Sequence, residues 1–150
     1  MIKREFKVIE KEVSAGSGDV VVSFSGRFDI IYSVGDNVIT LSREPLFGKI
    51  KDKIQREKKI KEAKEEVQSL AKQGVVQTPI QKDLAKFMVE NAENTVVAYE
   101  VYPPQEWKWN PPHDKEIISK EEQAQITEDI HSAFKALGIQ AVFPGEDIKE

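Results

Sequence analysis

Apolar and polar residues alternate along the first 42 positions, and this period of two predicts β-strands. The first strand runs from Phe6 to near Val13, and the Gly- and Ser-rich residues 14–19 predict a flexible hairpin connection after it. Three further alternating runs follow, at residues 20–25, 28–33 and 38–41. Because the connections between these runs are short, residues 1–42 are predicted to form a four-stranded antiparallel meander.

After Glu44–Pro45 the period-two alternation stops and a helical pattern begins. Proline is favoured in the first turn of a helix, so Pro45 is predicted to start one. Lys- and Glu-rich sequence then continues to Gly74, a residue type typical of the position just past a helix end. The apolar residues of this long predicted helix form two stripes, Leu46, Phe47, Ile50 and Ile54 on one face and Ile60, Ala63, Val67 and Leu70 on another. Such a helix either packs its two ends on different surfaces or bends between them.

Thr78, Pro79 and Gln81 form a capping box with proline at the first position, which predicts the start of a second helix. Its stripe is Ile80, Leu84, Phe87 and Met88, and its predicted end lies near Asn94. Residues 45–94 are therefore predicted to be a helical pair.

The remainder of the chain predicts a strand, a loop, a helix and a strand over residues 95–143, followed by a polar tail at 144–150. Residues 95–102 are apolar on nearly both faces, as in an interior strand. Ser119 and Glu122 form a capping box before a helix that Gly138 ends, and residues 139–143 are the final strand. The two strands either extend the sheet, parallel if adjacent, or pair in a second layer. The sequence thus predicts one α+β domain over residues 1–150.

Composition restricts the classes of function. The chain has 150 residues, a net charge of −4 and no cysteine. Disulfides, thiolate nucleophiles and Cys-containing zinc sites are therefore excluded. The N-terminal residues lack the apolar run of a signal peptide, and no apolar stretch approaches the roughly 20 residues that span a bilayer. We expect a cytoplasmic protein without membrane partners.

Residues 103–112 (PPQEWKWNPP) hold four of the seven prolines and both tryptophans. Paired prolines fix the backbone in extended conformations and exclude helix. Trp107 and Trp109 are two residues apart, so their rings are expected to point the same way. The loop either closes over the core as a lid or offers the two rings to a partner, where tryptophan is a frequent hot-spot residue.

A second candidate surface is basic. Residues 49–64 contain eight Lys or Arg residues and three acidic residues. Six of the basic residues form a candidate nucleic-acid surface, with Trp stacking on bases: Lys49, Lys51, Lys53, Arg56, Lys58 and Lys59. However, Asp52 with Arg56 and Glu57 with Lys61 have the spacing of ion pairs within a helix, so a solvated, self-paired face is the preferred interpretation.

Residues for chemistry are scarce. The two histidines are His113, in the predicted loop, and His131, in the last predicted helix. His131 and Asp129 are two residues apart on that helix and face different directions, so they make a poor chelate. We therefore predict no catalytic residue, no metal site and no cofactor.

These features together predict a non-enzymatic protein–protein interaction or assembly module that self-associates. One stripe of the long helix covers the sheet in this interpretation, and the other needs a second surface. A homodimer through Ile60, Val67 and Leu70 is the simplest arrangement, with Trp107 and Trp109 as further partner-binding residues. The alternative is nucleic-acid binding by the basic face.

Overall fold

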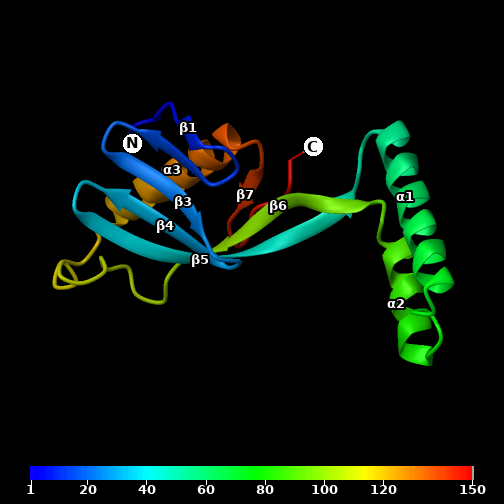
Figure 1. The fold of residues 1–150 in the computed structure, drawn as a ribbon. Helices are drawn as coiled ribbons and strands as arrows, with labels where there is room; N and C mark the ends of the chain where they lie inside the picture. The colour runs from blue at the N-terminus through cyan, green and yellow to red at the C-terminus, as the bar shows by residue number, and fades with distance from the viewer. Residues whose placement is uncertain (150) are drawn as a thin grey trace. The chain divides into compact units, whose positions relative to one another are not determined.

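The computed structural model describes residues 1–149 and has an α+β fold (Figure 1). The strands are β1 Lys7–Glu10, β2 Ser14–Ser17, β3 Val20–Ser25, β4 Asp29–Val34, β5 Asn37–Lys49, β6 Asn94–Tyr102 and β7 Gln140–Val142. The helices are α1 Lys53–Lys72, α2 Pro79–Glu90 and α3 Lys120–Ala136. This order confirms the predicted sequence of a meander, two helices and a strand–helix–strand unit.

The strands form one sheet in chain order, β1-β2-β3-β4-β5-β6-β7. Successive pairs from β1 to β5 are antiparallel, whereas β6 and β7 are parallel. The last two strands therefore extend the meander's sheet, and β6 is an interior strand as its apolar sequence predicts.

The chain divides into two compact units. The sheet unit comprises residues 1–46 and 97–149, and it contains most of the strands and α3. The hairpin unit comprises residues 47–96, with α1 and α2 packed against each other as a helical hairpin. Each unit is described by itself below.

Three predicted boundaries are wrong, and the first is that of the second strand. Residues 14–17, predicted to be part of a connection, form β2, which pairs along its length with β3. Ser14 and Ala15 are buried in this strand, although Gly16 and the serines give it little apolar character. Strand propensity reflects fit to a pleated, half-buried surface, and pairing with the strongly apolar β3 supplies that surface here.

The structure also corrects the start of the first helix. Pro45 lies in β5, which continues to Lys49, and α1 begins only at Lys53. The pairing of β5 with β4 ends at Ser42, so Pro45 lies where one side of the strand is outside the β4 ladder and a missing N–H is tolerated. Asp52 is the actual N-cap and accepts hydrogen bonds from the N–H groups of Ile54 and Gln55 at 2.9 and 3.1 Å.

Both predicted capping boxes are confirmed, as are the helix ends at Gly74 and Gly138. The predicted end of the second helix near Asn94 is wrong, because α2 ends at Glu90 and Asn94 begins β6. Thr78 and Ser119 each form a complete capping box with Gln81 and Glu122. Gly138 ends α3 with φ +81°, and the N–H groups of Gly138 and Ile139 bond to the carbonyls of Lys135 and Phe134. This is the Schellman arrangement, which satisfies carbonyls that the helix end would leave free.

The core of the sheet unit lies between the sheet and α3, which crosses one face of the sheet (Figure 1). The strand register aligns buried side chains in rows across the sheet, such as Ala15, Val22, Tyr32 and Ile39. The inner face of α3 packs there with five buried residues, Ile126, Asp129, Ile130, Ala133 and Phe134.

Asp129 is a fully buried carboxylate whose oxygens all have partners. It accepts a hydrogen bond from the Tyr32 hydroxyl at 2.6 Å and another from the Gln125 amide at 2.8 Å. Arg4 adds an ion contact at 3.3 Å, although its Nε–H is not aligned as a hydrogen bond. Because an unpaired buried charge is costly, this network fixes α3 and the N-terminal segment to β4.

Among residues 1–149, no helix combines the length and the apolar character needed to cross a bilayer.

The Tyr32–Asp129 hydrogen bond should make the free energy of unfolding decrease at alkaline pH. Burial, followed by the hydrogen bond to Asp129, raises the pKa of Tyr32 far above its ordinary value of 10.0. The unfolded chain therefore loses this proton at a pH where the native state keeps it. The contribution of the Tyr32 hydroxyl to the free energy of unfolding is fully present below pH ~10, and above that pH it falls by up to about 1.4 kcal/mol per pH unit.

We expect Tyr32→Phe to lower the free energy of unfolding by about 1.5–3 kcal/mol at neutral pH, because the bond it removes is made to a charged group. The difference from wild type should shrink as the pH rises above ~10. Urea unfolding at several pH values measures it. Tyr102→Phe is the comparison, since Tyr102 lies outside the core and its hydrogen bond to Glu100 raises its pKa only to about 12, so its effect should be smaller at every pH. A difference for Tyr32→Phe that is independent of pH contradicts the assignment.

Candidate functional site

The proline-framed loop closes over the core at one of its tryptophans. Trp109 is 4% exposed and belongs to the core cluster, whereas Trp107 is half-buried and packs against it. The loop is fixed to β5 by bonds from Asn110, whose N–H donates to the carbonyl of Val38 at 2.7 Å and whose side chain donates to Thr40 at 3.1 Å. For Trp109 this geometry favours the first alternative, a loop that closes over the core. The partner-binding role of Trp107 and Trp109 stays a prediction.

The predicted dimer residues of α1 lie on its half-buried face. The half-buried positions of this helix are Arg56, Ile60, Ala63, Val67 and Leu70. Apart from Arg56 these are the second stripe of the sequence analysis, and their partial burial is what packing against α2 produces. The dimer through Ile60, Val67 and Leu70 stays a prediction, and these side chains are only partly available to a partner.

The hairpin unit exposes a row of large apolar side chains on α2. Three residues of the predicted stripe, Ile80, Leu84 and Phe87, lie on one helix face and are 73%, 59% and 63% exposed; we call these three the α2 stripe. Met88, the fourth residue of the predicted stripe, is half-buried. The neighbouring face carries the buried Ala85. Apolar residues on two adjacent faces of a 12-residue helix were the available signal that one face would remain uncovered.

The basic residues of the nucleic-acid alternative are partly engaged in local contacts. Lys49 lies 3.6 Å from Glu93, and Lys59 lies 3.7 Å from Glu62. Arg56 donates to the carbonyl of Ile50 at 2.9 Å and not to Asp52, which caps the helix. Lys51, Lys53 and Lys58 are exposed. The contacts reduce the charge available to phosphates, and the alternative stays a prediction.

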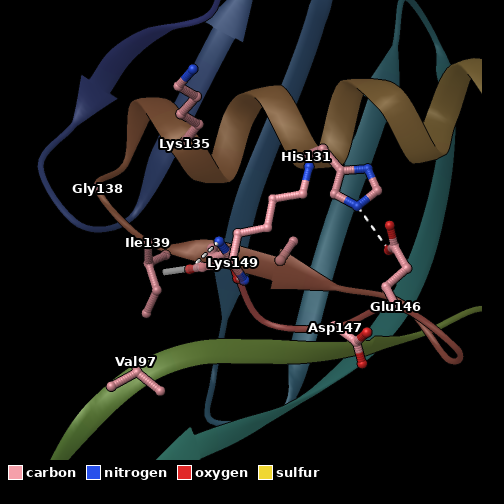
Figure 2. A pocket seen from close by; sticks show the side chains of 10 residues that line it. Val97, His131, Lys135, Gly138, Ile139, Glu146, Asp147 and Lys149 are labelled. Atoms are coloured by element: carbon pink, nitrogen blue, oxygen red, sulfur yellow. Dashed lines mark hydrogen bonds and ion pairs between the residues drawn. The ribbon is translucent and has the colours of Figure 1, made fainter. Parts of the chain in front are cut away.

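His131 lies in a pocket of the sheet unit, between α3, β7 and the C-terminal segment (Figure 2). The pocket has a volume of about 620 Å³. His131 Nε2 is 2.9 Å from a carboxylate oxygen of Glu146, and the same oxygen accepts the N–H of Phe143 at 2.7 Å. As expected from their spacing, Asp129 and His131 lie on different faces of α3: Asp129 is buried in the core, and His131 lines this pocket. Among residues 1–149, no group of three or more His, Asp or Glu side chains is arranged to hold a metal ion.

The C-terminal segment is held to β7 by one side chain. The Gln140 amide donates to the carbonyl of Lys149 at 3.1 Å, and its oxygen accepts the N–H of Lys149 at 2.8 Å. The Gln140 side chain thus bonds to both backbone groups of Lys149, as a neighbouring strand would. Gln125 does the same for Ile2 at the N-terminal end, with both bonds at 2.7 Å.

Comparison with models of protein families, with curated proteins and with solved structures finds no match for this chain.

The two tryptophans should differ sharply in stability experiments. We expect Trp109→Ala to cost about 3–5 kcal/mol, because it opens a cavity in the core. Trp107→Ala should cost less than about 2 kcal/mol, since its ring is only half-buried. Denaturant unfolding of both variants measures the costs. Equal costs would contradict the placement of Trp109 in the core.

Removal of the Gln140 clamp should free the C-terminal segment. We expect Gln140→Met to speed hydrogen exchange at the Lys149 amide roughly fivefold, because a hydrogen bond contributes on the order of 1 kcal/mol. Gln105→Met, at an exposed loop position, is the matched control. Exchange that stays at the wild-type rate in Gln140→Met would show that this clamp does not hold the segment.

Proposed function

We propose that the protein is a non-enzymatic assembly module that self-associates, and that two copies pair through the α2 stripe. The supporting observation is the exposure of Ile80, Leu84 and Phe87 on one helix face. Three large apolar side chains in a row are more than the scattered surface residues that need no explanation. Two-fold dimers are the commonest homo-oligomers, and such a dimer buries the same face of both copies.

The positions along α2 are self-complementary for an antiparallel pair centred on Leu84. Leu84 then faces its own copy, and Ile80 of each chain lies near Phe87 of the other, one residue from level. On the flank of the stripe, Asp83 of each chain lies near Lys86 of the other, which forms two pairs of opposite charge. Lys86 already lies 3.8 Å from Glu90 within its own chain, so its side chain extends along this flank.

The expected association is reversible. Full burial of a Leu, Ile or Phe side chain contributes about 1.5–3 kcal/mol, and six such side chains meet in the pair. Their partial burial in the free chain reduces this sum. Association costs about 4–15 kcal/mol in lost freedom of motion, so the net affinity is moderate. The half-buried residues Ile60, Val67 and Leu70 support α2 from behind, and Trp107 is a separate partner-binding residue in the sheet unit.

Sedimentation of the full chain over a range of concentrations tests the proposal. We expect a concentration-dependent dimer for the wild type and a monomer for Leu84→Glu, which places a carboxylate at the centre of the pair. Ile54→Glu is the matched control, because Ile54 is 81% exposed on the face of α1 opposite its half-buried stripe, and it should leave the dimer intact. A wild type that is monomeric at every concentration contradicts the proposal, as does a Leu84→Glu variant that still pairs.

Charge reversal tests the antiparallel arrangement itself. Asp83→Lys and Lys86→Asp each place like charges together twice in the pair, so each should weaken the dimer by roughly tenfold. The double variant restores opposite charges and should return to within about threefold of the wild type. Additive losses in the double variant would exclude this arrangement. Pairing with a different protein in place of a second copy would appear as a monomeric wild type.

A further inference from the structure

Arg43 is a buried cation in the sheet unit with an incomplete set of partners. It is 6% exposed, and its Nη2 donates to the carbonyl of Gly26 at 3.0 Å. The guanidinium carbon lies 4.0 Å from the centre of the Phe24 ring and 4.5 Å from that of Tyr99. The buried Nε has no hydrogen-bond partner.

The charge of Arg43 is therefore only partly compensated. Arginine stays protonated in proteins, so the guanidinium cannot become neutral to avoid the cost of burial. Among residues 1–149, no carboxylate oxygen lies within 4.0 Å of it. Two aromatic faces attract a cation but supply neither a negative charge nor acceptors for its remaining N–H groups. An anion is the partner that this environment lacks.

Arg43 lines a pocket of about 490 Å³ that can admit such a partner. The wall is formed by residues from five places in the chain: Glu12 and Val13, Phe24 and Gly26, Arg43, Tyr99, and residues 137–139 at the end of α3. Most of these side chains are apolar or aromatic. The pocket thus presents one buried cation beside an apolar wall, the combination that small organic ligands use for orientation and burial.

Glu12 gives the pocket a second unusual feature. It is the one described non-glycine residue with positive φ, at 63°. Glycine or asparagine is the usual choice for this conformation, and strained residues of this kind gather at ligand sites. Its carboxylate adds a negative charge to the wall, which opposes a bound anion and limits its affinity.

We infer that the Arg43 pocket binds a small organic anion with an apolar group, whose carboxylate pairs with Arg43 while the apolar group packs against Phe24, Tyr99 and Ile139. The planar guanidinium fits a carboxylate, and ligand burial completes the apolar wall. The C-terminal end of α3 carries a partial negative charge, but its last carbonyls are occupied by the bonds that end the helix. This site does not depend on self-association.

Benzoate is a suitable probe, with benzyl alcohol and acetate as matched compounds that lack the charge or the ring. We expect benzoate to shift the backbone amide NMR signals of Gly26, Arg43 and Gly138 saturably. It should bind at least tenfold more tightly than either comparison compound. Equal binding of benzoate and benzyl alcohol would overturn the inference, because the buried cation would then contribute nothing. Absence of a saturable shift would also overturn it.

Variants of the full chain separate the site from general effects. Arg43→Gln should lower benzoate affinity at least tenfold, whereas Arg27→Gln, which removes an exposed charge near Gly26, should leave it unchanged. Ile139→Trp fills the pocket with Arg43 in place and should abolish binding, which keeps the test decisive if Arg43→Gln does not fold. Glu12→Gln removes the opposing charge and should raise the affinity severalfold. Benzoate affinity that survives both Arg43→Gln and Ile139→Trp would overturn the assignment.

Discussion

The sheet unit depends on the burial of a complete face of α3, and that face includes a carboxylate. Four apolar residues and Asp129 are buried along the helix, so the helix can dock only if the charge is satisfied at the same time. Tyr32 in the middle of β4 supplies the central hydrogen bond, Gln125 supplies a second one, and Arg4 adds an ion contact. This requirement fixes the position of α3 along the sheet, and apolar packing alone would specify that position less strictly.

The same rule of satisfied partners identifies where function is to be sought. Within the sheet unit nearly every buried group is matched, and Trp109 and Ile118 complete the core from the loop side. Two features of the described residues depart from this rule in ways that suggest a ligand or a partner. The α2 stripe is an apolar surface without a cover in its own unit, and Arg43 is a buried charge without an anion. A surface of the first kind calls for a macromolecule, and a pocket of the second kind calls for a small ligand.

Much of the fold can be read from local sequence signals, because caps and alternation act over a few residues. Thr78, Ser119 and Gly138 mark helix boundaries by chemistry that requires no tertiary context. Pro45 misleads for the opposite reason: its place in β5 is acceptable only because β4 has already ended. The site is harder to predict. In sequence, Arg43 cannot be distinguished from a surface arginine. It is buried because the rings of Phe24 and Tyr99, both more than fifteen positions away, pack against its guanidinium. The α2 stripe is visible in sequence, but its exposure depends on which face α1 covers.

In the proposed assembly, a second copy of the chain covers the α2 stripe. Hydrogen exchange measured at several protein concentrations tests it residue by residue in the unmodified protein. Because pairing suppresses local opening of α2, we expect protection of the α2 amides to rise with concentration while protection of α3 stays constant. Protection of α2 that does not change with concentration would contradict it.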